Sequence, residues 1–116
     1  MRRLGIIFAA LLFGSSAYAQ TYRVLANSAN ASGTITSGGT YQQVYSQTWA
    51  RNGCAIQNNS THNMWVFLGP IASATHNNSV VLAAGTSLNC NVGNSILIDQ
   101  VSIDGTTADV FYAAQW

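Results

Sequence analysis

Lysine and glutamate are absent from this 116-residue sequence, and only 6% of its residues carry a charged side chain. Nucleic acids and anionic membranes are bound by clusters of lysine and arginine, so the sequence predicts neither as a partner. Charged residues also normally protect the edges of β-sheets from pairing with other chains. We therefore expect this protein either to cover its sheet edges or to use them for docking. Beyond residue 20 the net charge is 2 − 3 = −1, from Arg23, Arg51, Asp99, Asp104 and Asp109.

Helical periodicity is also missing from the sequence. No stretch combines a 3.6-residue spacing of apolar residues with capping residues at its ends. Instead, short runs of β-branched and aromatic residues alternate with turn-forming residues at intervals of about eight to twelve positions. The single proline, Pro70, follows Gly69 and ends one of these runs. We predict an all-β fold: a small antiparallel β-sandwich, jelly-roll-like or immunoglobulin-like, with one disulfide.

Residues 1–19 have the composition of a signal peptide. Arg2 and Arg3 precede an apolar core at 4–13, and Ala17-Tyr18-Ala19 is a small-x-small cleavage motif. The apolar core is shorter than the roughly 20 residues that a membrane-spanning helix needs. We predict cleavage after residue 19, a single domain at 20–116 with no membrane insertion after cleavage, and a bacterial secreted or periplasmic location.

The only cysteines are Cys54 and Cys90, and both follow the predicted signal peptide. In an oxidising compartment an even pair predicts a disulfide, which would help to stabilise a domain with a small core. The alternative is two small buried hydrophobic residues that never pair. We expect the disulfide.

The clearest strand pattern lies at residues 51–68. Apolar runs at 54–56 and 64–68 flank a polar tip of Asn, Ser, Thr and His, which predicts a β-hairpin. The second run is apolar at every position, so we expect a central strand with both faces covered. Two more hairpins are predicted, around Gly38-Gly39 and around Asp104-Gly105. The other predicted segments are a first strand or ordered arm at 22–26, a polar loop at 71–78, and short strands at 79–83, 87–90 and 109–114. The runs at 95–98 and 100–103 predict either two short strands or one bent strand.

His62 and His76 are the only histidines. A zinc site needs three or four converging ligands, and neither free thiols nor glutamates are expected here. If the strands at 64–68 and 79–83 form a simple antiparallel pair, the two histidines lie at opposite ends of it. We therefore expect two solvated turn histidines, with a metal or proton-transfer role as the less favoured reading. We predict no metal site and no cofactor.

The carboxylates give little support for catalysis. Asp104 precedes Gly105, where turn geometry alone explains it. Asp99 and Asp109 would approach each other across a 104–105 hairpin, which leaves a hydrolytic carboxylate pair open. Motifs for a serine nucleophile, a phosphate loop or a calcium loop are absent from the sequence. We predict that the protein is not an enzyme.

Aromatic residues make up 10% of the chain and include three tryptophans. In the 64–68 run, either Trp65 and Phe67 or the alternate set of Met64, Val66 and Leu68 faces the core. The other set then meets a second layer, an oligomer interface or a sugar. Two further tryptophans, outside the strongest strand runs, are better candidates for an exposed contact. The candidate interface or binding residues are Trp49, Trp65, Phe67 and Trp116.

Several of these segments together resemble a known family. They are the Thr-Ile-Thr-Ser-Gly-Gly-Thr run at 34–40, the Arg-Asn-Gly-Cys-Ala-Ile-Gln-Asn strand at 51–58 and the Trp-Val-Phe-Leu-Gly strand at 65–69. In this order they are similar to small β-sandwich domains of bacteriophage and prophage structural proteins, of the tail or capsid-accessory kind. The resemblance covers most of the mature chain and implies a structural role. The signal peptide and the cysteines at 54 and 90 depart from that pattern and imply a secreted relative of the fold.

We expect a secreted structural or binding protein that self-assembles into a homo-oligomer or docks onto another surface or virion protein, through a sheet edge or aromatic patch. The alternative is a monomeric carbohydrate- or surface-binding module that uses Trp49, Trp116 or loop asparagines. The third candidate is a small hydrolase using Asp99, Asp109 or His62. The Asn-x-Ser/Thr patterns at 58–61 and 77–79 are expected to be asparagine-rich turns.

Overall fold

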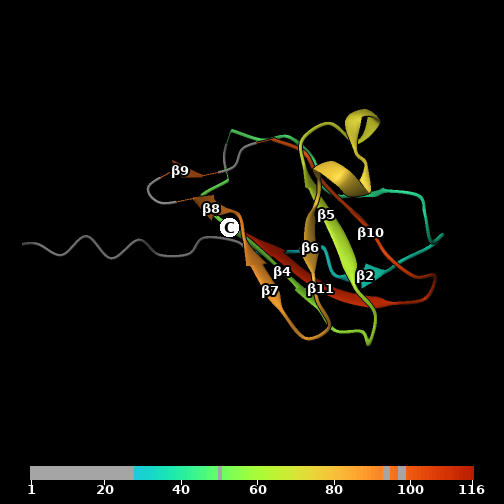
Figure 1. Ribbon diagram of the computed structural model, residues 1–116. Coiled ribbons are helices and arrows are strands. Elements are labelled where there is room, and N and C mark those ends of the chain that lie inside the picture. Colours follow the sequence, from blue (N-terminus) through green and yellow to red (C-terminus); the bar gives the residue numbers. More distant parts are fainter. Residues whose placement is uncertain (1–27, 50, 93–94, 97–98) are drawn as a thin grey trace, which may run out of the picture.

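The computed structural model describes residues 28–49, 51–92, 95–96 and 99–116 (Figure 1). The predicted signal peptide and the predicted strand or arm at 22–26 lie outside the described residues, as do positions 97–98 of the predicted 95–98 strand. Within the described part, no helix is long and apolar enough to cross a membrane.

Strands are the dominant elements of the described part, and the two helical elements are single 3-10 turns. The strands are β1 (Ala29–Asn30), β2 (Gly33–Thr34), β3 (Gln42–Tyr45), β4 (Cys54–Asn58), β5 (Met64–Leu68), β6 (Val80–Leu82), β7 (Ser87–Asn89), β8 (Asn91–Val92), β9 (Ser95–Ile96), β10 (Val101–Asp104) and β11 (Val110–Gln115). The 3-10 turns are η1 (Ile71–Ser73) and η2 (His76–Asn78).

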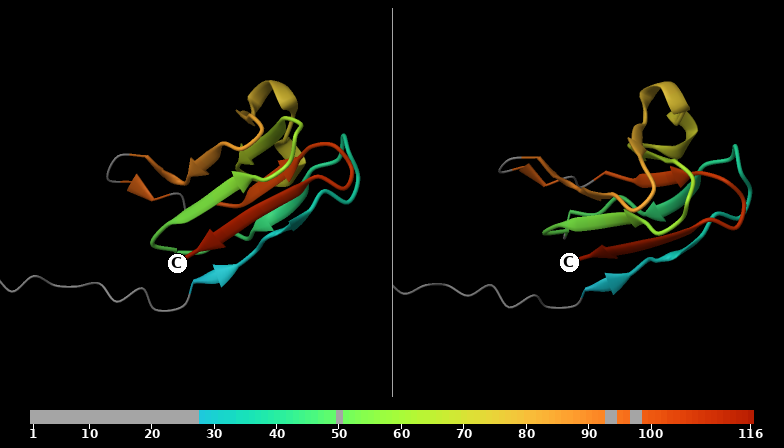
Figure 2. Two further views of the ribbon diagram at one scale, coloured as in Figure 1. Left: turned by 90° about the horizontal axis from the view of Figure 1, so that it is seen from below. Right: turned by 60° about the horizontal axis from the view of Figure 1, so that its bottom comes forward.

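The strands form two antiparallel sheets that stack as a sandwich (Figures 1 and 2). The β4 sheet has the order β1-β11-β4-β7, and β2 also pairs with β11. The β5 sheet has the order β3-β10-β5-β6. A separate ribbon of β8 and β9 lies outside both sheets. The prediction of an all-β antiparallel sandwich is confirmed.

The strand order distinguishes a jelly roll from an immunoglobulin-like sandwich. If β1 and β2 count as one broken strand and the β8–β9 ribbon is left out, the two sheets read 1-8-3-6 and 2-7-4-5. Every connection except β5 to β6 then crosses from one sheet to the other, including the four turns from β2 to β3, β4 to β5, β6 to β7 and β10 to β11. This is the two-sheet, eight-stranded arrangement of a jelly roll.

The three predicted hairpins are wrong, although each predicted turn is present. β4 pairs with β11 and β7, whereas β5 pairs with β10 and β6. The β2–β3 and β10–β11 connections likewise run from one sheet to the other. The reason is burial: strands on either side of each turn place apolar side chains in the shared core and so stack face to face. The buried core residues are Ile35, Tyr45, Cys54, Ile56, Met64, Val66, Leu82, Cys90, Val101, Ile103, Phe111 and Ala113.

The predicted disulfide between Cys54 and Cys90 is confirmed. Both residues are buried in the core, and their Cα atoms lie 5.1 Å apart. The backbone N–H of Cys90 also donates to the carbonyl of Cys54, at 2.9 Å. The bond therefore joins β4 to the residue that follows β7, at the end of the sandwich where the chain terminates.

β5 is a central strand with both faces covered, as predicted. Met64 and Val66 are fully buried between the sheets, and Leu68 packs against the same core. Trp65 and Phe67 point to the outer face of the β5 sheet and are half-buried. Residues 70–79, which we call the strap, cover this outer face with the turns η1 and η2, shown in gold in Figure 2.

Candidate functional site

Four of the connections between the two sheets, the turns that follow β2, β4, β6 and β10, lie at one end of the sandwich, which we call the turn end. Asn58, fully buried there, uses its whole amide group: Nδ2 donates to the carbonyls of His62 and Leu82 at 2.7 and 2.8 Å. Its Oδ1 accepts from the N–H and hydroxyl of Ser60 at 2.9 and 2.7 Å. The predicted asparagine-rich turn at 58–61 is therefore anchored by a buried residue, Asn58.

A His–Asp pair joins the strap to the end of β10. Nε2 of His76 lies 2.6 Å from Oδ2 of Asp104, whose side chain is 1% exposed. The other oxygen, Oδ1, accepts from the backbone N–H groups of Gly39 and Gly105 at 2.9 and 2.7 Å. The His76 ring also stacks on Trp65, with the ring centroids 4.0 Å apart. His76 is thus the main anchor of the strap on the outer face of the β5 sheet.

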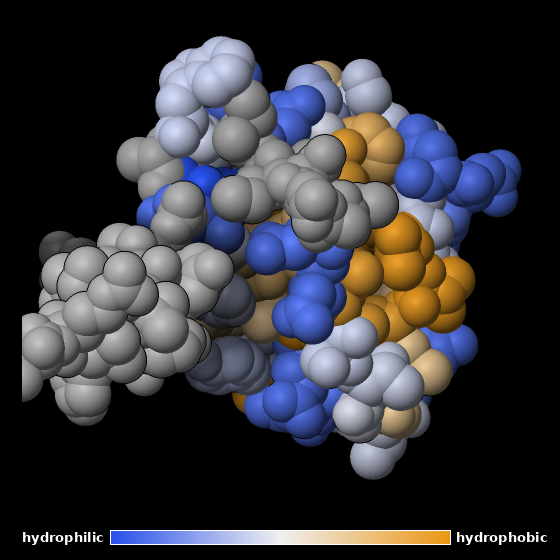
Figure 3. Space-filling model, turned by 90° about the vertical axis from the view of Figure 1, so that its left-hand side faces the viewer, coloured by the Kyte–Doolittle hydropathy of each residue, from blue (hydrophilic) through white to orange (hydrophobic). Residues whose placement is uncertain are grey.

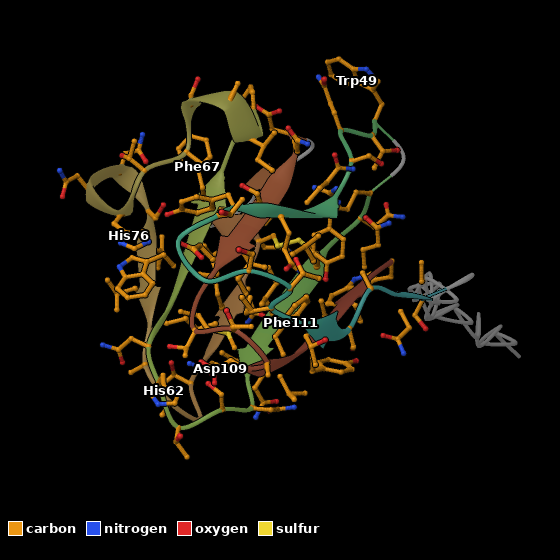
Figure 4. The ribbon with its side chains drawn as sticks, turned by 90° about the vertical axis from the view of Figure 1, so that its right-hand side faces the viewer. Trp49, His62, Phe67, His76, Asp109 and Phe111 are labelled. Carbon is orange, nitrogen blue, oxygen red and sulfur yellow. A yellow bond between two sulfur atoms is a disulfide. The ribbon has the colours of Figure 1, made fainter. Side chains whose placement is uncertain are left out.

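The second histidine makes an equivalent pair. Nδ1 of His62, in the β4–β5 turn, lies 3.0 Å from Oδ1 of Asp109, which follows the β10–β11 turn (Figure 4). Oδ2 of Asp109 is buried and has no hydrogen-bond partner among the described residues. The His62 side chain is 58% exposed.

The interpretation of both histidines as solvated turn residues is therefore wrong in one respect, since each is bonded to a buried aspartate. Asp104 is likewise more than a turn residue, because its carboxylate joins three segments of the turn end. The reason is the inter-sheet topology, which brings separate turns together. Sequence spacing alone does not show these contacts.

Asp99 and Asp109 do not form a facing pair. Asp99 precedes β10 and Asp109 follows the turn after β10, so the two lie at opposite ends of that strand. The expected approach assumed a hairpin that the structure does not contain. Within the described residues, no group of three or more His, Cys, Asp or Glu side chains is placed to hold a metal ion.

A buried arginine organises the opposite end, near the C-terminus. Arg51 is 4% exposed, and its guanidinium donates to Gln115 Oε1 and to the backbone carbonyls of Asp99 and Ser46 at 2.7 to 3.0 Å. Burial lowers its pKa from the usual value. The sequence pattern did not mark Arg51 as buried, since arginine is normally an exposed residue.

The predicted interface tryptophans have different surroundings. Trp49 is 82% exposed and projects from the domain on the side away from His62 and Asp109 (Figure 4). Trp116 is half-buried, and its backbone N–H donates to the Gly53 carbonyl. Its ring packs so closely on Gly53 that a Cβ added there would lie 2.6 Å from it. Of the two, only Trp49 has the exposure expected of a contact residue. Trp65 is partly covered by the His76 ring.

The sheet edges differ in how well they are protected. On one side, β1 and β2 are two-residue strands, and β3 has a register shift opposite Val101 and Ser102. On the other side, β6 and β7 end the two sheets, and no described strand pairs beyond either. Val80 and Val81 of β6 are 41% and 54% exposed. Figure 3 shows hydrophobic surface gathered on one side of the domain.

Charge does not protect this surface. Three of the four Arg and Asp side chains in the described part are buried, and Asp99 is half-buried. The exposed surface of the described domain is therefore built almost entirely from neutral side chains. Composition alone does not show that most charged side chains of the described part lie inside the domain.

No protein-family model matches the chain, and no curated protein is significantly similar to it. A solved structure with a related arrangement comes from Bacillus endospore appendages, described as a family of disulfide-linked pili. It is 19% identical, the match covers 77% of this chain and 81% of that one, and the TM-score is 0.43. A likeness this remote carries no argument about function. The resemblance to phage structural proteins is not shown by these comparisons and stays a prediction.

Proposed function

We propose that this protein is a non-catalytic structural subunit that works outside the cytoplasm and self-associates through the unpaired edge of β6. The observation that carries the proposal is the presence of two exposed valines, Val80 and Val81, on a regular edge strand that has no charge, proline or bulge. Natural proteins normally protect such edges by one of those means. The disulfide supports an oxidising compartment.

A second unpaired edge strand, β7, lies on the same side of the sandwich as β6. β7 ends the β4 sheet on the same side, and the turn at 83–86 joins it directly to β6. A second copy that pairs with β6 gains backbone hydrogen bonds that need no charge complementarity. The near absence of exposed charge also removes the repulsion that keeps most domains apart.

The test is the native mass of the mature, oxidised protein, measured by light scattering over a concentration series. We expect a fixed oligomer or a polymer for the wild type and a single-chain mass for Val81→Lys. Val110→Lys is the matched control, because Val110 is 46% exposed but lies on β11, which pairs with β2 and β4. A wild-type protein that stays monomeric at high concentration would overturn the proposal.

A second candidate function is a carbohydrate- or surface-binding module, which is favoured by the exposure of Trp49. Exposed tryptophans offer a flat apolar face to a partner. Trp49→Ala should then abolish binding to a surface or glycan while leaving the native mass unchanged.

A further inference from the structure

The imidazole ring of His76 is enclosed by side chains from three other segments. It lies flat on the Trp65 ring, with an interplanar angle of 6°. The Tyr41 ring stands beside it at 66°, with the centroids 6.0 Å apart. Oδ2 of Asp104 is bonded to the ring edge at 2.6 Å. The remaining side is open, since the His76 side chain is 46% exposed.

The two aromatic rings and the carboxylate are the kinds of group that bind a sugar ring. The flat face of one aromatic ring packs against the C–H face of a pyranose, and a second aromatic ring contacts the edge of the sugar. A buried carboxylate accepts a hydrogen bond from a sugar hydroxyl, and bonds of this O–H···O⁻ kind are short and strong. The imidazole of His76 makes the same two contacts, a flat stack and one donated hydrogen bond.

The strap that brings His76 to this place is only lightly attached. None of the residues of η1 or η2 is buried. Besides His76, the strap is tied to the sheet by the N–H of Ile71, which donates to Gln100 Oε1, and by the 2.6 Å bond between the hydroxyls of Ser79 and Tyr41. Moving the imidazole off Trp65 therefore exposes little apolar surface of the strap itself.

We propose that Trp65, Tyr41 and Asp104 form a saccharide-binding site that His76 fills as an intramolecular ligand. A pyranose binds by displacing the imidazole, with its C–H face on Trp65 and one hydroxyl donating to Asp104. Because the site is vacant in only a fraction of molecules, the apparent affinity of the wild type is reduced by that fraction. Removal of the imidazole ring therefore raises the affinity.

The experiment compares His76→Ala with His62→Ala in the full mature chain. His62 is the matched control, since it is the other exposed histidine bonded to a buried aspartate, and among the described residues it stacks on no tryptophan. The probes are the methyl glycosides of glucose, galactose, mannose and N-acetylglucosamine, followed by tryptophan fluorescence. We expect at least one to bind His76→Ala tenfold or more tightly than it binds the wild type or His62→Ala. Adding Trp65→Ala to His76→Ala should abolish the binding.

A second measurement uses the wild type and does not depend on how the variant folds. The His76 ring protons lie over Trp65, so a saturating glycoside that displaces the ring should shift their NMR resonances towards those of a solvated histidine. The proposal fails if none of the four glycosides moves these resonances, or if His76→Ala, folded by circular dichroism, binds none of them. Neither result bears on self-association, which is measured separately by native mass.

Discussion

The guanidinium of Arg51 lies over the ring of Tyr45, with Cζ 5.1 Å from the ring centroid. Both side chains are buried, and they close the core at the end of the sandwich where the chain terminates. Tyr45 in turn donates its hydroxyl to the carbonyl of Ala55 at 2.9 Å, which ties β3 to β4 across the two sheets. This pair is a second structural centre besides the disulfide.

Replacement of Arg51 by Met should destabilise the domain by about 3 kcal/mol, because it removes the hydrogen bonds that the charged guanidinium donates to Gln115 and to the carbonyls of Ser46 and Asp99. Arg51→Lys should recover only part of the loss, since an ammonium group cannot reproduce the planar fork. Chemical denaturation measures the change. Asn52→Ala, at the exposed neighbouring position, should have little effect. Equal losses at the two positions would contradict the structural role of Arg51.

Tyr45 should make the protein sensitive to alkali. Burial is the main cause that raises the pKa of its phenol above the usual value of about 10. The folded chain therefore holds this proton more tightly than the unfolded chain, so the stabilisation is complete below about pH 10 and is lost as the pH rises further. Denaturation at pH 8 and pH 11 should show this loss in the wild type. The loss of stability between pH 8 and pH 11 should be smaller in the Tyr45→Phe variant. The control variant, Tyr112→Phe, changes an exposed tyrosine and should lose as much stability as the wild type.

Asn58→Asp should be strongly destabilising at neutral pH. The substitution keeps the acceptor for Ser60 but removes the Nδ2 donor, and it places a charge opposite the carbonyls of His62 and Leu82. We expect a loss of about 2–4 kcal/mol in the free energy of unfolding. The matched control is Asn59→Asp, the same change at the exposed adjacent residue. If both variants unfold at the same denaturant concentration, the buried network has been misassigned.

Reduction of the disulfide should lower stability by about 4 kcal/mol in the chain-entropy model, given the sequence separation of 36 residues between Cys54 and Cys90. Thermal unfolding with and without reductant measures the effect. The double variant Cys54→Ala/Cys90→Ala should already be destabilised and should not respond to reductant. A response in the double variant would show that the reductant acts elsewhere.

The candidate site was predictable only in part. The sequence pattern marked Trp65, His76 and Asp104 separately, but their spacing of 11 and 28 residues in the chain does not indicate contact. His76 reaches Trp65 because the strap folds back over the outer face of β5. Asp104 reaches both because β10 pairs with β5, with Asp104 opposite Trp65. These relationships depend on strand neighbours that are distant in sequence.

Signals in the sequence are enough to predict a small all-β domain with a Cys54–Cys90 disulfide, few charged residues and turns near Gly38, Asn59, Gly85 and Gly105. Each of these is local, since it follows from strand propensity, turn chemistry or the number of cysteines and charges. The separation of the strands that flank each turn into two different sheets follows from tertiary packing alone. A turn signal shows that the chain reverses, whereas face-to-face burial of Ile56 and Met64 in a common core decides whether the returning strand pairs or stacks. That choice produced the jelly roll, the unprotected β6 edge and the aromatic site under His76.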